Sequence, residues 1–263
     1  MLGKLLKYDL KWIYKVVVVF YVLSLIFSCI GRALSYIENS VIFSIVSQFS
    51  LGIAVAMMIS SLINCVLRLW VRFIKNIYKD ESYLTHTLPI EKKTIYTSKI
   101  ISALISVITT GVIIIISLFI CFYSEGNIEA LKSILEIAAS SYNTTVMNLV
   151  LLIALVLIMQ VIFIVMVGYT AIILGHKSNK NKMVKTLVIG FGLYFLTQIL
   201  SLAVIFIFGL LNPDIMNLIN TTSEINVGIL KVLMYLAIGI YVVYNAFYYI
   251  LGKKQFEKGV NVE

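Results

Sequence analysis

The chain has 263 residues, of which 61% are hydrophobic and 13% are charged, and its mean hydropathy is +1.02. Soluble domains carry about 25% charged residues, so this composition excludes an ordinary soluble protein. The net charge of +9 does not indicate a nucleic-acid partner, because the basic residues occur in short segments between long apolar runs, as they do in membrane proteins.

The first fifteen residues predict an amphipathic helix. Its apolar positions recur every three or four residues, and its lysines occupy the other face; the apolar set is Leu2, Leu6, Leu10 and Ile13, and the lysines are Lys4, Lys7, Lys11 and Lys15. This pattern is typical of a helix that lies in the membrane surface with its basic side toward anionic headgroups. A cleaved signal peptide is disfavoured because the basic region is long and contains an acid, Asp9.

Six apolar runs follow, each of about 20 residues or more, the length that crosses a bilayer core of about 30 Å. The sequence therefore predicts an all-α polytopic membrane protein with a single transmembrane domain over residues 1–263. The expected spans cover about 16–35, 43–67, 100–123, 146–174, 184–211 and 227–251.

The distribution of lysine and arginine predicts the orientation. All of the 21 basic residues except Arg32, Lys132 and Lys231 fall on one side of the predicted membrane, and that side is expected to be cytoplasmic, with both chain termini. The composition, rich in Ile, Lys and Asn, favours a bacterial source and hence the inner membrane. On the outer side, helical periodicity predicts a surface helix over 126–139, and Asn212-Pro213-Asp214 predicts the start of a short helix that ends near Ile219.

The longest strongly polar stretch, residues 75–99, lies between the second and third spans. Its acidic pair predicts the start of a short helix or turn over Asp80–Pro89, and Pro89 is expected in the first turn of the helix that becomes the third span. Such a segment would present apolar and aromatic side chains to a soluble partner; these are Tyr83, Leu84, His86 and Leu88. An ordinary solvated loop is the alternative.

No catalytic or metal-binding motif is apparent. The chain has no G-x-x-x-x-G-K-[ST] phosphate loop and no H-E-x-x-H, and His86 and His176 lack neighbours at metal-ligand spacing. No Asp, Glu, Lys, Arg or His lies near the middle of a predicted span, which argues against a proton-driven carrier, an ion pump and an intramembrane protease. If the protein moves a substrate, we expect the energy to come from another chain.

A few polar and aromatic side chains within the spans are candidates for packing or for function. Gln160 and Gln198 lie near mid-membrane, where interhelical hydrogen bonding is the simpler interpretation and lining of a translocation path is the alternative. The aromatic residues near the end of the last span are interpreted as an interfacial belt; they are Tyr241, Tyr244, Phe247, Tyr248 and Tyr249.

The string Tyr83-Leu84-Thr85-His86-Thr87-Leu88-Pro89-Ile90, preceded by an acidic pair and followed by Ser98-Lys99, resembles the first cytoplasmic loop of bacterial ABC exporter permeases of the ABC-2 superfamily. In those proteins a Y-L-T-x-T-L-P-[VI] string often lies between spans two and three. The layout is also similar: an amphipathic N-terminal helix, six spans, cytoplasmic termini and no nucleotide motif.

The resemblance implies a permease subunit that is not itself an enzyme and carries no cofactor. Two such subunits, identical or related, would pair with two cytoplasmic ATPase subunits that bind ATP and Mg. Residues 2–14 would form the connecting helix and residues 80–89 the coupling helix, which docks on the ATPase through Asp80, Glu81, Tyr83, Leu84, His86, Leu88 and Pro89. Small relatives often export antimicrobial peptides, toxins or hydrophobic small molecules.

Two other functions remain open from the sequence. A membrane sensor or anchor would use the same loop to hold a cytoplasmic signalling partner. A membrane enzyme that acts on lipid or prenyl substrates should show paired acids or metal ligands near one membrane face, and the sequence shows no such group.

Overall fold

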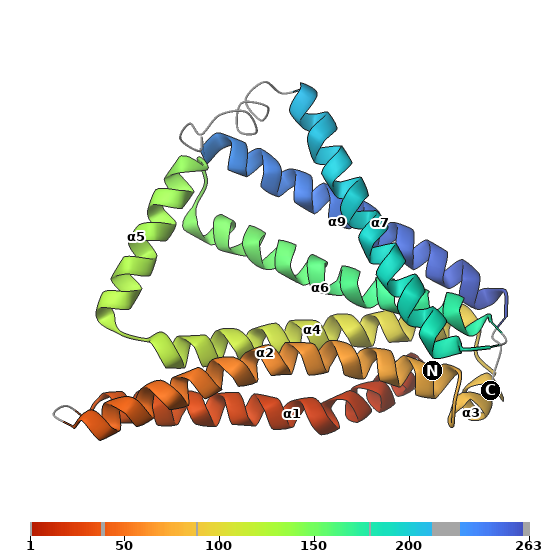
Figure 1. The fold of residues 1–263 in the computed structure, drawn as a ribbon, viewed down its shortest axis with the longest axis horizontal. Coiled ribbons are helices and arrows are strands. Elements are labelled where there is room, and N and C mark those ends of the chain that lie inside the picture. Colours follow the sequence, from red (N-terminus) through yellow and green to blue (C-terminus); the bar gives the residue numbers. More distant parts are fainter. Residues whose placement is uncertain (1, 38–39, 88, 179, 212–226, 260–263) are drawn as a thin grey trace. The chain divides into compact units, whose positions relative to one another are not determined.

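A computed structural model describes the chain except for residues 1, 38–39, 88, 179, 212–226 and 260–263. The described residues form eight helices and no strand (Figure 1). Six of these helices are long and apolar enough to cross a membrane. The prediction of an all-α protein with six candidate spans is therefore confirmed. The short outer helix expected from Asn212 to Ile219 lies outside the described residues.

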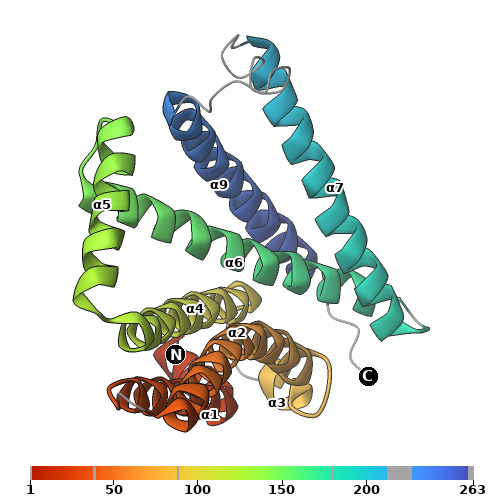
Figure 2. The same ribbon diagram turned by 60° about the vertical axis from the view of Figure 1, so that its left-hand side comes forward.

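The chain divides into two compact units, which are described separately. The first unit consists mainly of Met1–Glu129 and the second of Ala130–Asn261. The first contains α1 (Leu2–Ser35), α2 (Val41–Ile77), α3 (Ser82–Thr87) and α4 (Lys92–Phe122). Its three long helices pack against one another, and the short α3 contacts α2 (Figures 1 and 2).

Helix α1 is one continuous helix of 34 residues. The segment expected to lie in the membrane surface and the first expected span therefore belong to one helix. There is no break near residue 15, because no residue there interrupts the backbone hydrogen bonds of the helix. One face of α1 is buried along its whole length, and it consists of Asp9, Ile13, Val17, Tyr21, Ser24, Ser28 and Gly31. Of the predicted apolar face, Ile13 is buried, whereas Leu2, Leu6 and Leu10 are only half-buried. That residues 1–15 lie in the membrane surface stays a prediction.

Hydroxyl groups line the contact between α1 and α4. The Tyr21 hydroxyl lies 2.6 Å from Oγ1 of Thr110, and Oγ of Ser24 lies 3.2 Å from Oγ of Ser117. Small polar residues of this kind are common between membrane helices, where they allow close approach and hydrogen bonding. Gly31 allows α1 and α2 to approach closely, since a Cβ at this position would lie only 2.8 Å from the Leu51 side chain.

The second unit contains most of α5 (Glu125–Ser141) and the long helices α6 (Val146–His176), α7 (Lys182–Leu211) and α9 (Val227–Glu257). Helix α5 confirms that the segment predicted over 126–139 is helical. Helix α6 is the central element of this unit, because it packs against both α7 and α9.

An aromatic cluster joins the three long helices of the second unit. The Phe163 ring on α6 lies between 5.7 and 6.3 Å, centroid to centroid, from the rings of Tyr194, Tyr241, Tyr244 and Tyr248. Only 1% of Tyr248 is exposed. These tyrosines of α9 pack inward because α6 offers them a buried aromatic partner, and their position at the membrane surface stays a prediction.

Helices occupy both ends of the polar stretch between the second and third spans. Helix α2 continues to Ile77, and α4 already begins at Lys92, with Glu91 as its N-cap residue. Pro89 thus lies three residues before α4 and not in its first turn. The segment between the two helices consists of a tight turn, α3 and a short connection.

Candidate functional site

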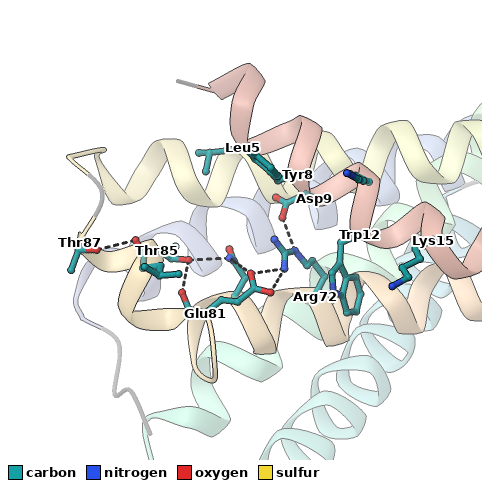
Figure 3. Close-up of a pocket in the computed structure, with 12 residues that line it drawn as sticks. Leu5, Tyr8, Asp9, Trp12, Lys15, Arg72, Glu81, Thr85 and Thr87 are labelled. Carbon is teal, nitrogen blue, oxygen red and sulfur yellow. Dashed lines mark hydrogen bonds and ion pairs between the residues drawn. The ribbon is translucent and has the colours of Figure 1, made fainter.

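Three buried charged side chains meet at one end of the first unit, and Figure 3 shows two of them, Asp9 and Arg72. Asp9 of α1, Arg72 of α2 and Lys99 of α4 are 2%, 7% and 2% exposed. Nε of Arg72 donates to Oδ1 of Asp9 at 2.8 Å, and Nζ of Lys99 lies 2.7 Å and 2.8 Å from the two carboxylate oxygens of Asp9. One carboxylate thus joins all three long helices of this unit.

The same arginine also holds the segment that contains α3. Nη1 of Arg72 donates to both carboxylate oxygens of Glu81, at 2.8 and 2.6 Å. The Asn76 amide donates to Oε2 of Glu81 at 3.1 Å and to Oγ1 of Thr85 at 2.9 Å. We call Asp9, Arg72, Glu81 and Lys99 the ion network; it connects α1, α2 and α4 to the residue that precedes α3.

Local sequence explains why these side chains meet. Arg72 and Asn76 are four residues apart and therefore lie on one face of α2. After α2 the chain turns back sharply: the Ser82 amide donates to the Lys79 carbonyl at 2.7 Å, and the Glu81 amide donates to the Lys75 carbonyl at 3.2 Å. This turn directs Glu81 and the inner face of α3 back toward Arg72 and Asn76.

The ion network balances its own charge, with two carboxylates against one guanidinium and one ammonium. Buried charges are tolerated when they are paired and hydrogen-bonded, whereas removal of one partner typically costs about 3–5 kcal/mol. The ring of Trp12 on α1 adds a further contact, since the guanidinium carbons of Arg68 and Arg72 lie 5.0 and 5.6 Å from its centroid. Just after α2, burial raises the pKa of the Tyr78 hydroxyl, so this group stays neutral.

The outer face of α3 differs from its inner face. Tyr83 and Leu84 are 77% and 67% exposed, as the sequence predicted for a docking surface. His86 is turned inward, with Nε2 3.2 Å from the Ile77 carbonyl oxygen.

The structure therefore divides the predicted coupling residues into groups. Asp80 and Pro89 are exposed, as are Tyr83 and Leu84, whereas Glu81 belongs to the ion network. Its carboxylate is engaged by Arg72 and Asn76, which differs from the capping role expected for the acidic pair. Leu88 lies outside the described residues.

The predicted pathway residues lie on different helices of the second unit. Gln160 on α6 and Gln198 on α7 are both exposed on the second unit, and no hydrogen bond involving either is seen within the described residues. Whether either residue lines a translocation path stays a prediction.

The sequence does not predict the ion network, because Arg72 and Lys99 occur among several other basic residues between the second and third predicted spans. One signal was available. Asp9 is the only acid among the first 37 residues, and it lies four residues before Ile13, on the face that the helix buries. Among the described residues, no group of three or more His, Cys, Asp or Glu side chains could hold a metal ion. The arrangement of the ion network is suited to joining helices.

Comparisons of the chain with protein-family models, with curated proteins and with solved structures find no match. The function is therefore argued from the geometry of this site and from the sequence of the loop that contains α3.

Proposed function

We propose that the chain is the membrane-spanning permease subunit of an ATP-driven exporter, and that α3 couples it to a separate ATPase subunit. The six candidate spans and the resemblance of residues 83–90 to the coupling loop of ABC-2 permeases support this function. The observation that carries it is the two-sided character of α3: one face is bound to the ion network, and the other exposes Tyr83 and Leu84.

The exposed face suits a docking contact. Aromatic residues that are buried by a partner often dominate the energy of an interface, and Tyr83 and Leu84 are adjacent on a helix of six residues. Because Ser82 and Thr85 are buried on the opposite side, α3 is held as a defined element. A groove on a soluble partner would receive it with little loss of conformational freedom.

The inner face suits the transmission of movement. A displacement of α3 would be transferred through Glu81 to Arg72, and from Arg72 through Asp9 to Lys99. These are charge-assisted hydrogen bonds, which are shorter and stronger than neutral ones. We therefore infer that movement of α3 reaches α1, α2 and α4 together and is not absorbed by a compliant loop.

The remaining features of the proposal follow from the charge distribution and from the resemblance. The chain would lie in a bacterial inner membrane with both termini in the cytoplasm, and it would pair with a second permease copy. ATP and Mg would bind to the ATPase partner. The cargo would be an antimicrobial peptide, a toxin or a hydrophobic small molecule, and this statement rests on the resemblance alone.

Purification of the tagged chain from its native membrane in mild detergent tests this function. Recovery of an ATPase with Walker motifs in an equimolar amount is expected. Recovery of a kinase or another signalling protein without any ATPase would overturn the proposal in favour of a membrane sensor or anchor.

A further inference from the structure

A cavity of about 650 Å³ lies beside the ion network, between α1, the end of α2 and α3 (Figure 3). Leu5 and Trp12 of α1 and Leu84 of α3 give it apolar walls. The two acids that line it, Asp9 and Glu81, are already engaged by the ion network. The acidic groups therefore add no unpaired negative charge to the cavity.

The unpaired charge of the cavity is positive. Lys11 and Lys15 also line it, one turn apart on α1, and both are exposed. No ion pair of either lysine is seen within the part of the chain that the structure describes. An anion at this rim would contact both ammonium groups while its apolar part lies against Trp12.

The sequence around the cavity is that of a membrane boundary. The apolar run of α1 starts at Val16, directly after Lys15, and Trp12 lies one turn before it. Tryptophan and lysine are enriched where a membrane helix meets the headgroup layer. With the orientation expected from the basic residues, the cavity lies at the headgroups of the cytoplasmic leaflet, where anionic lipids attract basic side chains.

We propose that this cavity binds one anionic phospholipid. Lys11 and Lys15 hold the phosphate of its headgroup, Trp12 contacts its glycerol, and its acyl chains follow α1 from Val16 into the membrane. The binding itself requires no ATPase, so this inference can fail while the proposed function stands, and the reverse also holds.

Native mass spectrometry of the full chain in detergent tests the proposal, with phosphatidylglycerol titrated as the probe. The Lys11→Gln/Lys15→Gln variant is expected to bind the lipid at least about tenfold more weakly, since each lysine near a membrane surface contributes about 1 kcal/mol. The matched control is Lys4→Gln/Lys7→Gln, which removes the same charge from the same helix at exposed positions that do not line the cavity. This control is expected to bind like the unmodified chain.

Three further measurements identify the occupant. The Lys11→Arg/Lys15→Arg variant should retain the lipid, because it keeps both charges. Equal loss in the two Gln variants, or equal retention of phosphatidylcholine, would overturn the proposal and indicate unspecific contact with annular lipid. Displacement of the lipid by inorganic phosphate would also overturn it, because the site would then be one for free phosphate.

Discussion

Arg72 and Glu81 lie nine residues apart in the chain and face each other across the turn between α2 and α3, with Nη1 of Arg72 2.6 Å from Oε2 of Glu81. The guanidinium is buried by α1 and α2, whereas the side chain of Glu81 is 38% exposed. The pair thus joins a buried part of the first unit to a segment at its surface.

The pair between Arg72 and Glu81 should determine how firmly α3 is held. Glu81→Ala removes the acceptor of Arg72 and Asn76, so amide hydrogen exchange in α3 is expected to become faster. The loss of global stability should stay near about 1 kcal/mol, because the carboxylate is partly exposed. Asp80→Ala is the control, since Asp80 is exposed. Unchanged exchange in α3 after Glu81→Ala would contradict the assigned role.

Asp9 should matter far more to stability than any other acid at the proposed cytoplasmic side. Asp9→Asn leaves Lys99 and Arg72 buried with their charges unbalanced, which is expected to lower the free energy of unfolding by about 3–5 kcal/mol. Thermal unfolding in detergent measures this effect. Glu91→Gln breaks the exposed pair with Lys93 and is expected to change stability by less than about 1 kcal/mol.

A double variant separates the loss of charge balance from the loss of packing. Asp9→Asn combined with Lys99→Met removes one carboxylate and one ammonium together, so the combined cost should be smaller than the sum of the two single costs. Simple additivity would show that Asp9 and Lys99 do not interact, in conflict with their separation of 2.7 Å.

The sequence predicted the features that depend on local patterns, and it did not predict the contacts between residues that are far apart in the chain. Long apolar runs predicted the six candidate spans, because length and hydropathy are local properties. The exposure of Tyr83 and Leu84 was also predicted from the loop itself. The contact of Asp9 with Lys99 joins residues 90 positions apart, and it depends on the rotation of α1 about its axis. No local pattern specifies that rotation, so lysines on one face of α1 suggested only a membrane-surface helix.

The exposed face of α3 should be required for coupling but not for folding. Tyr83→Asp/Leu84→Asp places two charges at exposed positions, so thermal stability is expected to stay within about 0.5 kcal/mol of the original value. ATP hydrolysis by the co-purified ATPase should no longer respond to the permease. The conservative variant Tyr83→Phe/Leu84→Met should retain the response. Retained coupling in the Asp variant would exclude this face as the contact.

The aromatic cluster should be the main packing centre of the second unit. Phe163→Ala leaves a cavity among four tyrosine rings, and a cost of about 3 kcal/mol is expected. Phe247→Ala removes a phenyl ring from the same unit at a position that is 54% exposed, so its effect should be much smaller. Thermal unfolding compares the two variants directly, and equal losses would contradict the central position of Phe163.

Site-specific photo-crosslinking in native membranes tests the central claim most directly. A photoreactive tyrosine analogue at Tyr83 is compared with the same analogue at Tyr36, which is similarly exposed but lies just after the other end of α1. The proposed function predicts an adduct with a Walker-motif ATPase from Tyr83 and none from Tyr36. An adduct from Tyr83 with a signalling protein, or no ATPase adduct at all, would contradict the assignment of α3 as the coupling helix.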